Sequence, residues 1–307
     1  MARIADLLAA GRTVSFEFFP PKNDAEQALL VRTVRDLEPL APSFVSVTYR
    51  GGRSSRRRTT ELVTALLHLT ALTPMAHLIC TGHSRLELAE ILVELRKAGI
   101  ENLMALGGDP PSEPGAPPGE LEHALELVQL ARAIGGFSIG VAAHPAGHPR
   151  SASREEDRDR LAEKLEVADF AVTQFFFDLA EYLELVAALE ARGIRKPVLP
   201  GIMPVTSPQS IPRMAAMGSP VPNWLAREIE AAETPEAARA AGIDGATALC
   251  AALLDAGAPG LHFYTLNRST ATREIHDRLG LASAGAGASA GPGTASGAGS
   301  GPSRATL

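Results

Sequence analysis

VSFEFFPPKNDAEQALLVRTVRDLEPLAPSFVSVT, residues 14–48, contains the unit that decides the fold. Two short apolar runs, at 14–18 and 44–48, flank a segment of helical period that begins at Asp24. Apolar runs joined by such a segment predict two parallel strands connected by a helix. Both runs are apolar nearly throughout rather than alternating with polar residues, which indicates strands buried on both faces.

The same alternation of apolar run and helical segment continues along most of the chain. Helical segments begin at or near residues 24, 60, 84, 120, 153, 178 and 207. Ser84 and Glu87 have the spacing of a helix-capping pair, and Gly99 ends the same helix. The predicted strands are Val14–Phe18, Phe44–Thr48, Met75–Cys80, Asn102–Leu106, Phe137–Ala142, Phe170–Phe175, Val198–Gly201 and Gly260–Tyr264.

Strands in strict alternation with helices favour a closed barrel over an open, doubly wound sheet. No Gly-x-Gly-x-x-Gly follows the first strand, so a Rossmann dinucleotide site is disfavoured. The chain has 307 residues, and one barrel needs about 250. We therefore predict a single-domain α/β protein, a (β/α)8 TIM barrel, over residues 1–282. From about Ser283 the composition falls to Gly, Ala, Ser and Pro, which predicts a disordered tail over 283–307.

Composition and charge argue against several classes of function. The formal net charge of −6 argues against a strongly basic face for nucleic acid. No apolar run reaches the ~20 residues that span a membrane, and the first residues lack a signal-peptide core, so we expect a cytoplasmic protein. Cys80 and Cys250 are far apart, with no Cys/His pattern at zinc spacing, so we expect reduced thiols and no metal.

In a (β/α)8 barrel the chemistry lies at the carboxyl ends of the strands. Glu17 lies in the first predicted strand, between Phe16 and Phe18. Burial beside aromatic rings would raise the pKa of this carboxyl, which suits a general acid near neutral pH. The alternative is a structural ion pair between Glu17 and an arginine at another strand end.

Polar side chains also stand at the ends of the other predicted strands. The adjacent glycines at 107–108 let a backbone approach a flat ligand, with Asp109 beside it, although a simple turn explains the same residues. Gln174 stands among phenylalanines and needs partners if buried, which a ligand or the core would supply. The remaining candidates at strand ends are Thr48, Tyr49, His77, His144, His148 and Arg268.

Six motifs occur in order on separate predicted strands: SFEFFPP at 15–21, FVSVTY at 44–49, ALGGD at 105–109, VTQFFFD at 172–178, LPGIMP at 199–204 and HFYTLNR at 262–268. With these motifs the chain resembles the methylenetetrahydrofolate reductase family of the short bacterial type, from about residue 13 to residue 281. The resemblance implies a barrel that binds FAD at the strand ends, takes hydride from NADH or NADPH, and reduces a folate substrate. It also allows a homo-oligomer, because relatives are often multimers.

Carried over by position, the resemblance implies roles for the strand-end residues. Glu17 matches the general acid that protonates N10 of the folate and opens its five-membered ring. Asp109 matches a catalytic carboxylate that holds the pterin, and Gln174 and Arg268 match substrate-binding positions. The positions that match the cofactor side are Thr48, Tyr49, His77, Gly108, Asp109, His144, His148, Asp157 and Lys164.

Departures from the family pattern lie on the cofactor side. Gly107 stands where the family usually has an arginine, His144 stands where it usually has a tyrosine, and Arg50 and Arg53 enter a loop of small residues. Some relatives lack a flavin, so direct hydride transfer from NADH to the folate is one alternative. A barrel that binds folate or nucleotide without turnover is another, and the retained Glu17 argues against it.

Overall fold

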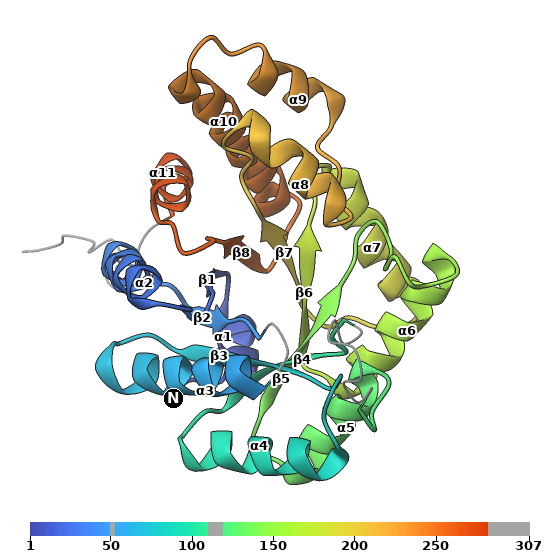
Figure 1. Cartoon of the computed structure of the whole chain (residues 1–307). Helices are drawn as coiled ribbons and strands as arrows, with labels where there is room; N and C mark the ends of the chain where they lie inside the picture. Colours follow the sequence, from blue (N-terminus) through green and yellow to red (C-terminus); the bar gives the residue numbers. More distant parts are fainter. Residues whose placement is uncertain (50–52, 110–118, 282–307) are drawn as a thin grey trace, which may run out of the picture.

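Parallel strands close into a barrel surrounded by helices in the computed structural model, which describes residues 1–49, 53–109 and 119–281 (Figure 1). The strands follow chain order around the barrel, and β1 pairs with both β2 and β8. The predicted α/β fold, a (β/α)8 TIM barrel, is confirmed. The predicted tail over 283–307 and Arg50 lie outside the described residues. The strands are β1 Thr13–Phe18, β2 Phe44–Val47, β3 Pro74–Ile79, β4 Asn102–Leu106, β5 Ser138–Ala143, β6 Phe170–Phe175, β7 Val198–Ile202 and β8 Gly260–Tyr264.

The strands β4, β6 and β8 have the predicted bounds, and the others differ from prediction by one residue at one or both ends. The predicted cap of helix α4, Arg85–Lys97, is also confirmed. Ser84 Oγ accepts a hydrogen bond from Glu87 N at 3.2 Å, and the Glu87 carboxylate accepts one from Ser84 N at 2.9 Å. Gly99 has a φ of 84° after this helix, which lets Ile100 N bond back to Leu95 O at 2.9 Å.

Several helices differ from the prediction. Helix α3 begins at Arg53 rather than near Thr60. The predicted start was too late because the first turns carry arginine and serine and show no apolar period. Helix α5 begins at Ala124 rather than near Glu120, and the short helices α1, α9 and α11 were not predicted. The helices are α1 Ile4–Ala10, α2 Asp24–Leu37, α3 Arg53–Leu69, α4 Arg85–Lys97, α5 Ala124–Ile134, α6 Arg154–Val167, α7 Leu179–Ala191, α8 Ile211–Ala216, α9 Asn223–Glu230, α10 Pro235–Asp255 and α11 Thr270–Arg278, with 3-10 turns at Glu38–Leu40 and Pro208–Ser210.

The apolar core has an outer and an inner part. The outer part lies between the sheet and the helices, where Phe16 and Phe18 of β1 belong to the same cluster as helix side chains such as Leu88. The inner part fills the amino-terminal half of the barrel, where side chains from the strands meet Ile4 and Leu8 of α1. Helix α1 therefore closes the amino-terminal end of the barrel and leaves the carboxyl end for polar residues.

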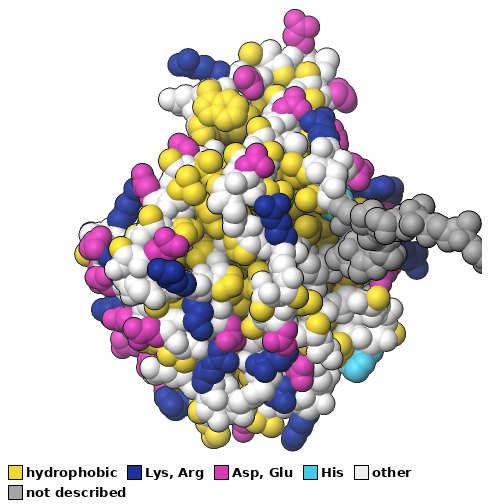
Figure 2. Space-filling model, turned by 180° about the vertical axis from the view of Figure 1, so that it is seen from behind, with side chains coloured by type: hydrophobic (Ala, Val, Ile, Leu, Met, Phe, Trp, Pro, Cys, Tyr) yellow, Lys and Arg dark blue, Asp and Glu magenta, His cyan; other side chains and the backbone are white. Residues whose placement is uncertain are grey.

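Charges of both signs are interspersed on the face seen from behind, without a continuous basic area on its described residues (Figure 2). Helix α10 is long and apolar enough to cross a membrane by length and composition alone. It packs along α9 and α11 and buries Ile243, Cys250 and Leu253 in the outer core. One face of α10 therefore belongs to the outer core.

Candidate active site

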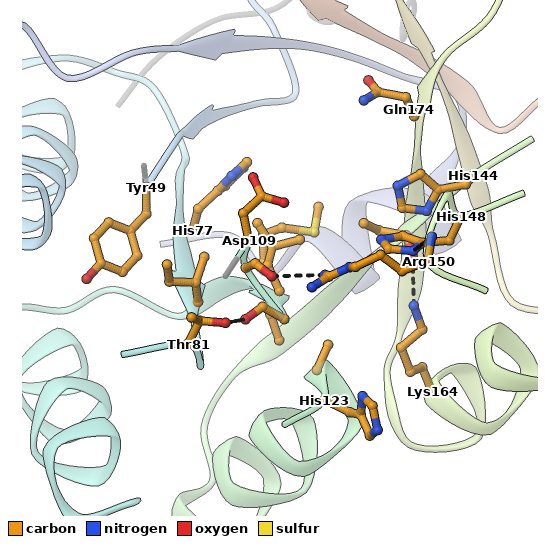
Figure 3. A pocket seen from close by; sticks show the side chains of 18 of the residues that line it. Tyr49, His77, Thr81, Asp109, His123, His144, His148, Arg150, Lys164 and Gln174 are labelled. Carbon is orange, nitrogen blue, oxygen red and sulfur yellow. Dashed lines mark hydrogen bonds between the residues drawn. The ribbon is translucent and has the colours of Figure 1, made fainter. Parts of the chain in front are cut away.

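A large cavity lies at the carboxyl ends of the strands and has a volume of about 1610 Å³ (Figure 3). Ligand pockets usually measure about 300–1,000 Å³, so this cavity has room for more than one ligand of ordinary size. The structure brings the predicted site residues together around it, with the exception of Arg268. Those that line the cavity are Glu17, Thr48, Tyr49, His77, Gly108, Asp109, His144, His148, Asp157, Lys164 and Gln174.

Glu17 lies at the floor of this cavity, on β1, and its side chain is buried. Because successive side chains of a strand point to opposite faces, Phe16 and Phe18 point outward into the outer core. These two rings are therefore on the other face of the sheet from the carboxylate. The prediction of a raised pKa for Glu17 is wrong, because groups inside the barrel outweigh the effect of burial.

Two imidazoles and a hydroxyl surround the Glu17 carboxylate instead. Its Oε2 lies 3.5 Å from His77 Nε2 and 3.6 Å from His262 Nε2, and it accepts a hydrogen bond from Ser46 Oγ at 3.3 Å. Burial raises the pKa of Glu17, but His262, His77 and Ser46 together outweigh burial and leave the pKa below its ordinary value. The ligand-free carboxyl is therefore ionised near neutral pH, and its partners in the described structure are histidines rather than an arginine.

Ser15 and Thr173 fix the groups around Glu17. Ser15 Oγ lies 2.8 Å from His262 Nδ1, so the Nε2 edge of the ring faces Glu17. Tyr264 OH donates a hydrogen bond to Thr173 O at 2.6 Å, which holds the phenol at the cavity wall. Sequence reasoning gave these residues no role, although the two-residue period places Ser15, His262 and Tyr264 on the same face as Glu17. Thr173 contributes its backbone carbonyl, which no side-chain period indicates.

One buried polar atom at the cavity, Thr48 Oγ1, has no hydrogen-bond partner among the described residues, and His77 Nε2 has only the ion-pair contact with Glu17 at 3.5 Å. Buried polar groups are nearly always paired, so the Thr48 hydroxyl indicates a partner that a ligand or water supplies. Gly108 has a φ of 86°, and a Cβ there would lie 3.1 Å from Ile79 and from Thr81 Oγ1. A glycine at 108 therefore lets the end of β4 lie close against β3.

His144, His148 and Lys164 form the wall that β5 and α6 contribute. The two imidazole rings meet edge to face, with centroids 4.6 Å apart. Burial, with the nearby His148 and Lys164, lowers the pKa of His144 to about 3, and burial and Arg150 lower the pKa of His148. Lys164 Nζ donates a hydrogen bond to Ala142 O at 3.1 Å. Both imidazoles are therefore uncharged at neutral pH.

The three residues predicted to contact the substrate, besides Glu17, differ in their position relative to the cavity. Asp109 is exposed at the rim. Gln174 Oε1 accepts a hydrogen bond from Phe175 N at 3.1 Å, which leaves the amide nitrogen for a ligand. Arg268 is exposed on the turn after β8 and does not line the cavity, so its contact with substrate stays a prediction.

A closed parallel barrel with a polar cavity at the carboxyl ends of its strands defines the TIM-barrel class, whose enzymes carry their active sites at this face. Within the described residues no group of three or more His, Cys, Asp or Glu side chains is placed to hold a metal ion. The sequence matches the methylenetetrahydrofolate reductase family over residues 3–280. The chain belongs to this family.

Individual relatives agree with this assignment. The chain is 36% identical over 271 residues to 5,10-methylenetetrahydrofolate reductase of Pectobacterium carotovorum subsp. carotovorum, which covers 87% of this chain and 90% of that protein. The Escherichia coli (strain K12) protein of the same name is 34% identical with the same coverage. A protein of Oryza sativa subsp. japonica described as probable methylenetetrahydrofolate reductase (NADH) is 33% identical over 91% of this chain and 50% of its own length.

Among solved structures, an uncharacterized protein from Clostridium thermocellum that binds two copies of 5-methyl-5,6,7,8-tetrahydrofolic acid has a similar fold. The TM-score is 0.64 at 12% sequence identity, over 91% of this chain and 96% of that one. At this identity the likeness concerns the barrel alone.

Proposed function

We propose that this protein reduces 5,10-methylenetetrahydrofolate to 5-methyltetrahydrofolate, with NADH or NADPH as the hydride source, FAD as the carrier and Glu17 as the general acid. Membership of the methylenetetrahydrofolate reductase family supports the reaction, and the name of the rice relative supports NADH. The observation that carries the assignment of the acid is the position of Glu17, buried at the cavity floor between His77 and His262.

Reduction of this folate requires a proton as well as a hydride. The proton goes to N10, the bond between N10 and the bridging methylene breaks, and the methylene carbon of the resulting N5 iminium ion accepts the hydride. Glu17 loses its proton to N10 and becomes a carboxylate. His262, His77 and Ser46 stabilise that carboxylate, and the lowered pKa of Glu17 supports their role in the donation step.

The same stabilisation reduces the protonated share of Glu17 before substrate binds. We propose that folate binding shifts this balance, because a pterin over the cavity floor excludes water from the carboxyl. Exclusion of water adds to the burial that already raises the pKa of Glu17, against the histidines that lower it. Glu17 then carries its proton in the complex, where N10 receives it.

Features of the cavity wall support FAD as the carrier. Thr48 Oγ1 is a buried atom without a described hydrogen-bond partner, which the polar edge of a flavin would pair, and Gly108 keeps the end of β4 close to β3. Lys164 places a cation on the β5 and α6 wall. When bound, FAD supplies hydride transfer between the nicotinamide and the folate. The volume of about 1610 Å³ suits a cofactor together with a second ligand.

Direct hydride transfer from NADH to the folate is the second candidate, and Gly107 favours it. This residue lines the cavity, and the nearest atom to a Cβ built there lies 3.9 Å away. Residue 107, just after β4, therefore contributes only backbone to the cavity, although there is room for a side chain that would contact a bound cofactor. A wall that offers few side chains to a flavin is compatible with a nicotinamide lying directly against the folate.

The visible absorption spectrum of the purified protein, with and without added FAD, tests the proposal together with an assay of methylated folate. A yellow protein whose flavin bands bleach with NADH and return with methylenetetrahydrofolate supports the route through FAD. A colourless protein that still oxidises NADH with this folate supports direct transfer. Tight folate binding without turnover, with either NADH or NADPH, contradicts the proposal and favours a binding protein.

A further inference from the structure

Arg150 lies at the cavity rim and connects the loop after β5 to the residues that follow the neighbouring strand β4. Its Nη2 donates a hydrogen bond to Gly108 O at 3.0 Å, and its backbone N donates one to His148 Nδ1 at 3.1 Å. Figure 3 shows the guanidinium between Asp109 on one side and His144 and His148 on the other. Arg150 therefore joins two strand-end loops across the cavity wall.

The charged side chains around the cavity are unequal in number. The basic residues among the described lining are Arg150, Arg160 and Lys164. An anionic ligand binds such a surface only where a cation is not already neutralised. The carboxylates of the same lining outnumber the basic residues: Glu17, Glu87, Asp109, Glu120, Glu122, Glu156, Asp157 and Glu163.

Of the three basic residues, Arg150 has the charge that is least neutralised by its neighbours. Arg160 lies 3.4 Å from the Glu163 carboxylate. Lys164 bonds to a backbone carbonyl, and burial lowers its pKa. Arg150 bonds to an uncharged carbonyl and has no carboxylate within ion-pair distance in the part of the chain that the structure describes. Most of its N–H donors are therefore left for a ligand.

The imidazoles beside Arg150 do not add positive charge. The pKa of His144 is about 3, lowered by burial and the cations around it, and the pKa of His148 is lowered by burial and by Arg150 itself. Neutral imidazoles offer hydrogen bonds but little Coulombic attraction for an anion. The cationic character of this part of the wall therefore comes from Arg150, with Lys164 behind it.

We propose that Arg150 binds the pyrophosphate of the dinucleotide that occupies this cavity. The inference rests on the proposed function, because it requires a dinucleotide site. FAD and NADH both carry a pyrophosphate, and a planar guanidinium pairs with phosphate oxygens through parallel hydrogen bonds. Through its bond to Gly108 O, the arginine also holds the glycine pair of β4 against the ligand.

Gly107 offers an internal check on this proposal. It lines the cavity one residue before Gly108, and a Cβ built there lies 3.9 Å from its nearest neighbour, Ala124 N. A longer side chain therefore has room at 107. An arginine placed there would bring a cation to the same part of the wall from β4 instead of β5.

The test is equilibrium binding of FAD, NADH and riboflavin to the full-length protein, after removal of any bound flavin. Arg150→Ala should weaken binding of the pyrophosphate-bearing ligand by about tenfold or more. Riboflavin binding should not change, because riboflavin has no pyrophosphate. Arg150→Lys should keep part of the affinity, and Gly107→Arg in the Arg150→Ala background should restore it. Whichever of FAD and NADH responds is the dinucleotide that Arg150 holds.

Arg154→Ala is the matched control, because Arg154 lies nearby on α6 but bonds to Ala146 O at 3.1 Å and does not line the cavity. It should leave each Kd unchanged, and thermal unfolding of each variant checks that the fold is intact. If Arg150→Ala binds FAD and NADH each with the same affinity as the wild type, the inference about Arg150 is overturned but the proposed function is not. An equal loss of riboflavin and dinucleotide binding also overturns it, because the role is then structural. A wild type that binds neither dinucleotide overturns the proposed function as well.

Discussion

The two ends of the barrel differ in how their polar groups are paired. At the amino-terminal end, Asn102 Oδ1 accepts a hydrogen bond from Ile4 N at 2.9 Å, and its Nδ2 donates to Ala2 O at 3.0 Å. At the carboxyl end, Thr48 Oγ1 is buried without a hydrogen-bond partner among the described residues, and His77 Nε2 has only the Glu17 carboxylate at 3.5 Å. The polar groups that anchor α1 are paired within the protein, whereas the open end has a buried hydroxyl that awaits a ligand.

This difference separates residues that hold the fold from residues that serve chemistry. The closed end buries apolar side chains under α1, and the open end gathers carboxylates, imidazoles and a lysine around the cavity. One buried hydroxyl near the closed end, Thr13 Oγ1, also lacks a described partner, and nothing in the structure explains it. Mutations at the two ends should therefore have different effects.

The largest expected change in stability is at the closed end. Phe170→Ala removes a fully buried ring of the inner core and should lower the free energy of unfolding by about 3–5 kcal/mol. Leu266→Ala truncates a side chain that is 45% exposed at the cavity and should cost less than about 0.5 kcal/mol. Urea unfolding of both variants measures the contrast. Similar losses at the two ends would contradict this division.

Removal of the polar anchor of α1 should have a smaller effect. Asn102→Ala leaves Ile4 N without its acceptor and should destabilise the protein by about 1–3 kcal/mol. Because Asn102 lies at the end away from the cavity, FAD and NADH affinities should not change. Urea unfolding and equilibrium binding check both parts, and a loss of affinity would show that the two ends are coupled.

His144 should make the ligand-free protein less stable in acid. Its pKa is about 3 in the folded protein against an ordinary 6.5, so the unfolded chain takes up a proton that the folded protein does not. Stability is then full above about pH 6.5 and falls as the pH drops toward 3, by at most about 1.4 kcal/mol per pH unit. His144→Asn should flatten this slope in urea unfolding at pH 7, 6 and 5, chosen within the window of the shift. Equal slopes would refute the assignment.

The smallest change concerns the pH profile of the reaction. His262 lowers the pKa of Glu17 through its hydrogen bond and charge, so His262→Gln should raise that pKa. A higher pKa keeps the acid protonated to higher pH, and the profile of kcat/KM for the folate should extend in that direction. Tyr264→Phe serves as a comparison from the same strand. A profile that does not move in His262→Gln would contradict the role of His262.

Much of the fold could be predicted from the sequence. The bounds of β4 and β8 were predicted correctly because their apolar runs end in Gly107 and Thr265. The bounds of β6 were also correct, although Phe176 and Phe177 continue its apolar run. The start of α3 was not predicted correctly, because a run of arginine and serine is compatible with either a loop or a helix. The short helices α1 and α9 offer too few turns for a clear period, and contacts with the barrel and its neighbouring helices stabilise them.

The sequence predicted which residues line the cavity better than it predicted their pKa values. Strand ends could be located, so Glu17, His77 and Gln174 could be placed on one cavity. The pKa of Glu17 was predicted in the wrong direction. Burial does raise it, but His262, His77 and Ser46, which come from other strands, lower it by more. Which side chains meet across the barrel depends on strand register, and register is a property of the closed sheet that no single segment contains.

The most direct test of the central claim compares Glu17→Gln with the wild type in two separate steps. One step is NADH oxidation with a quinone acceptor, and the other is reduction of methylenetetrahydrofolate. With Glu17 as the acid, folate reduction should fall by about 100-fold or more while NADH oxidation stays close to the wild-type rate. Near-normal folate reduction in Glu17→Gln would contradict the account, because the proton would then come from another group.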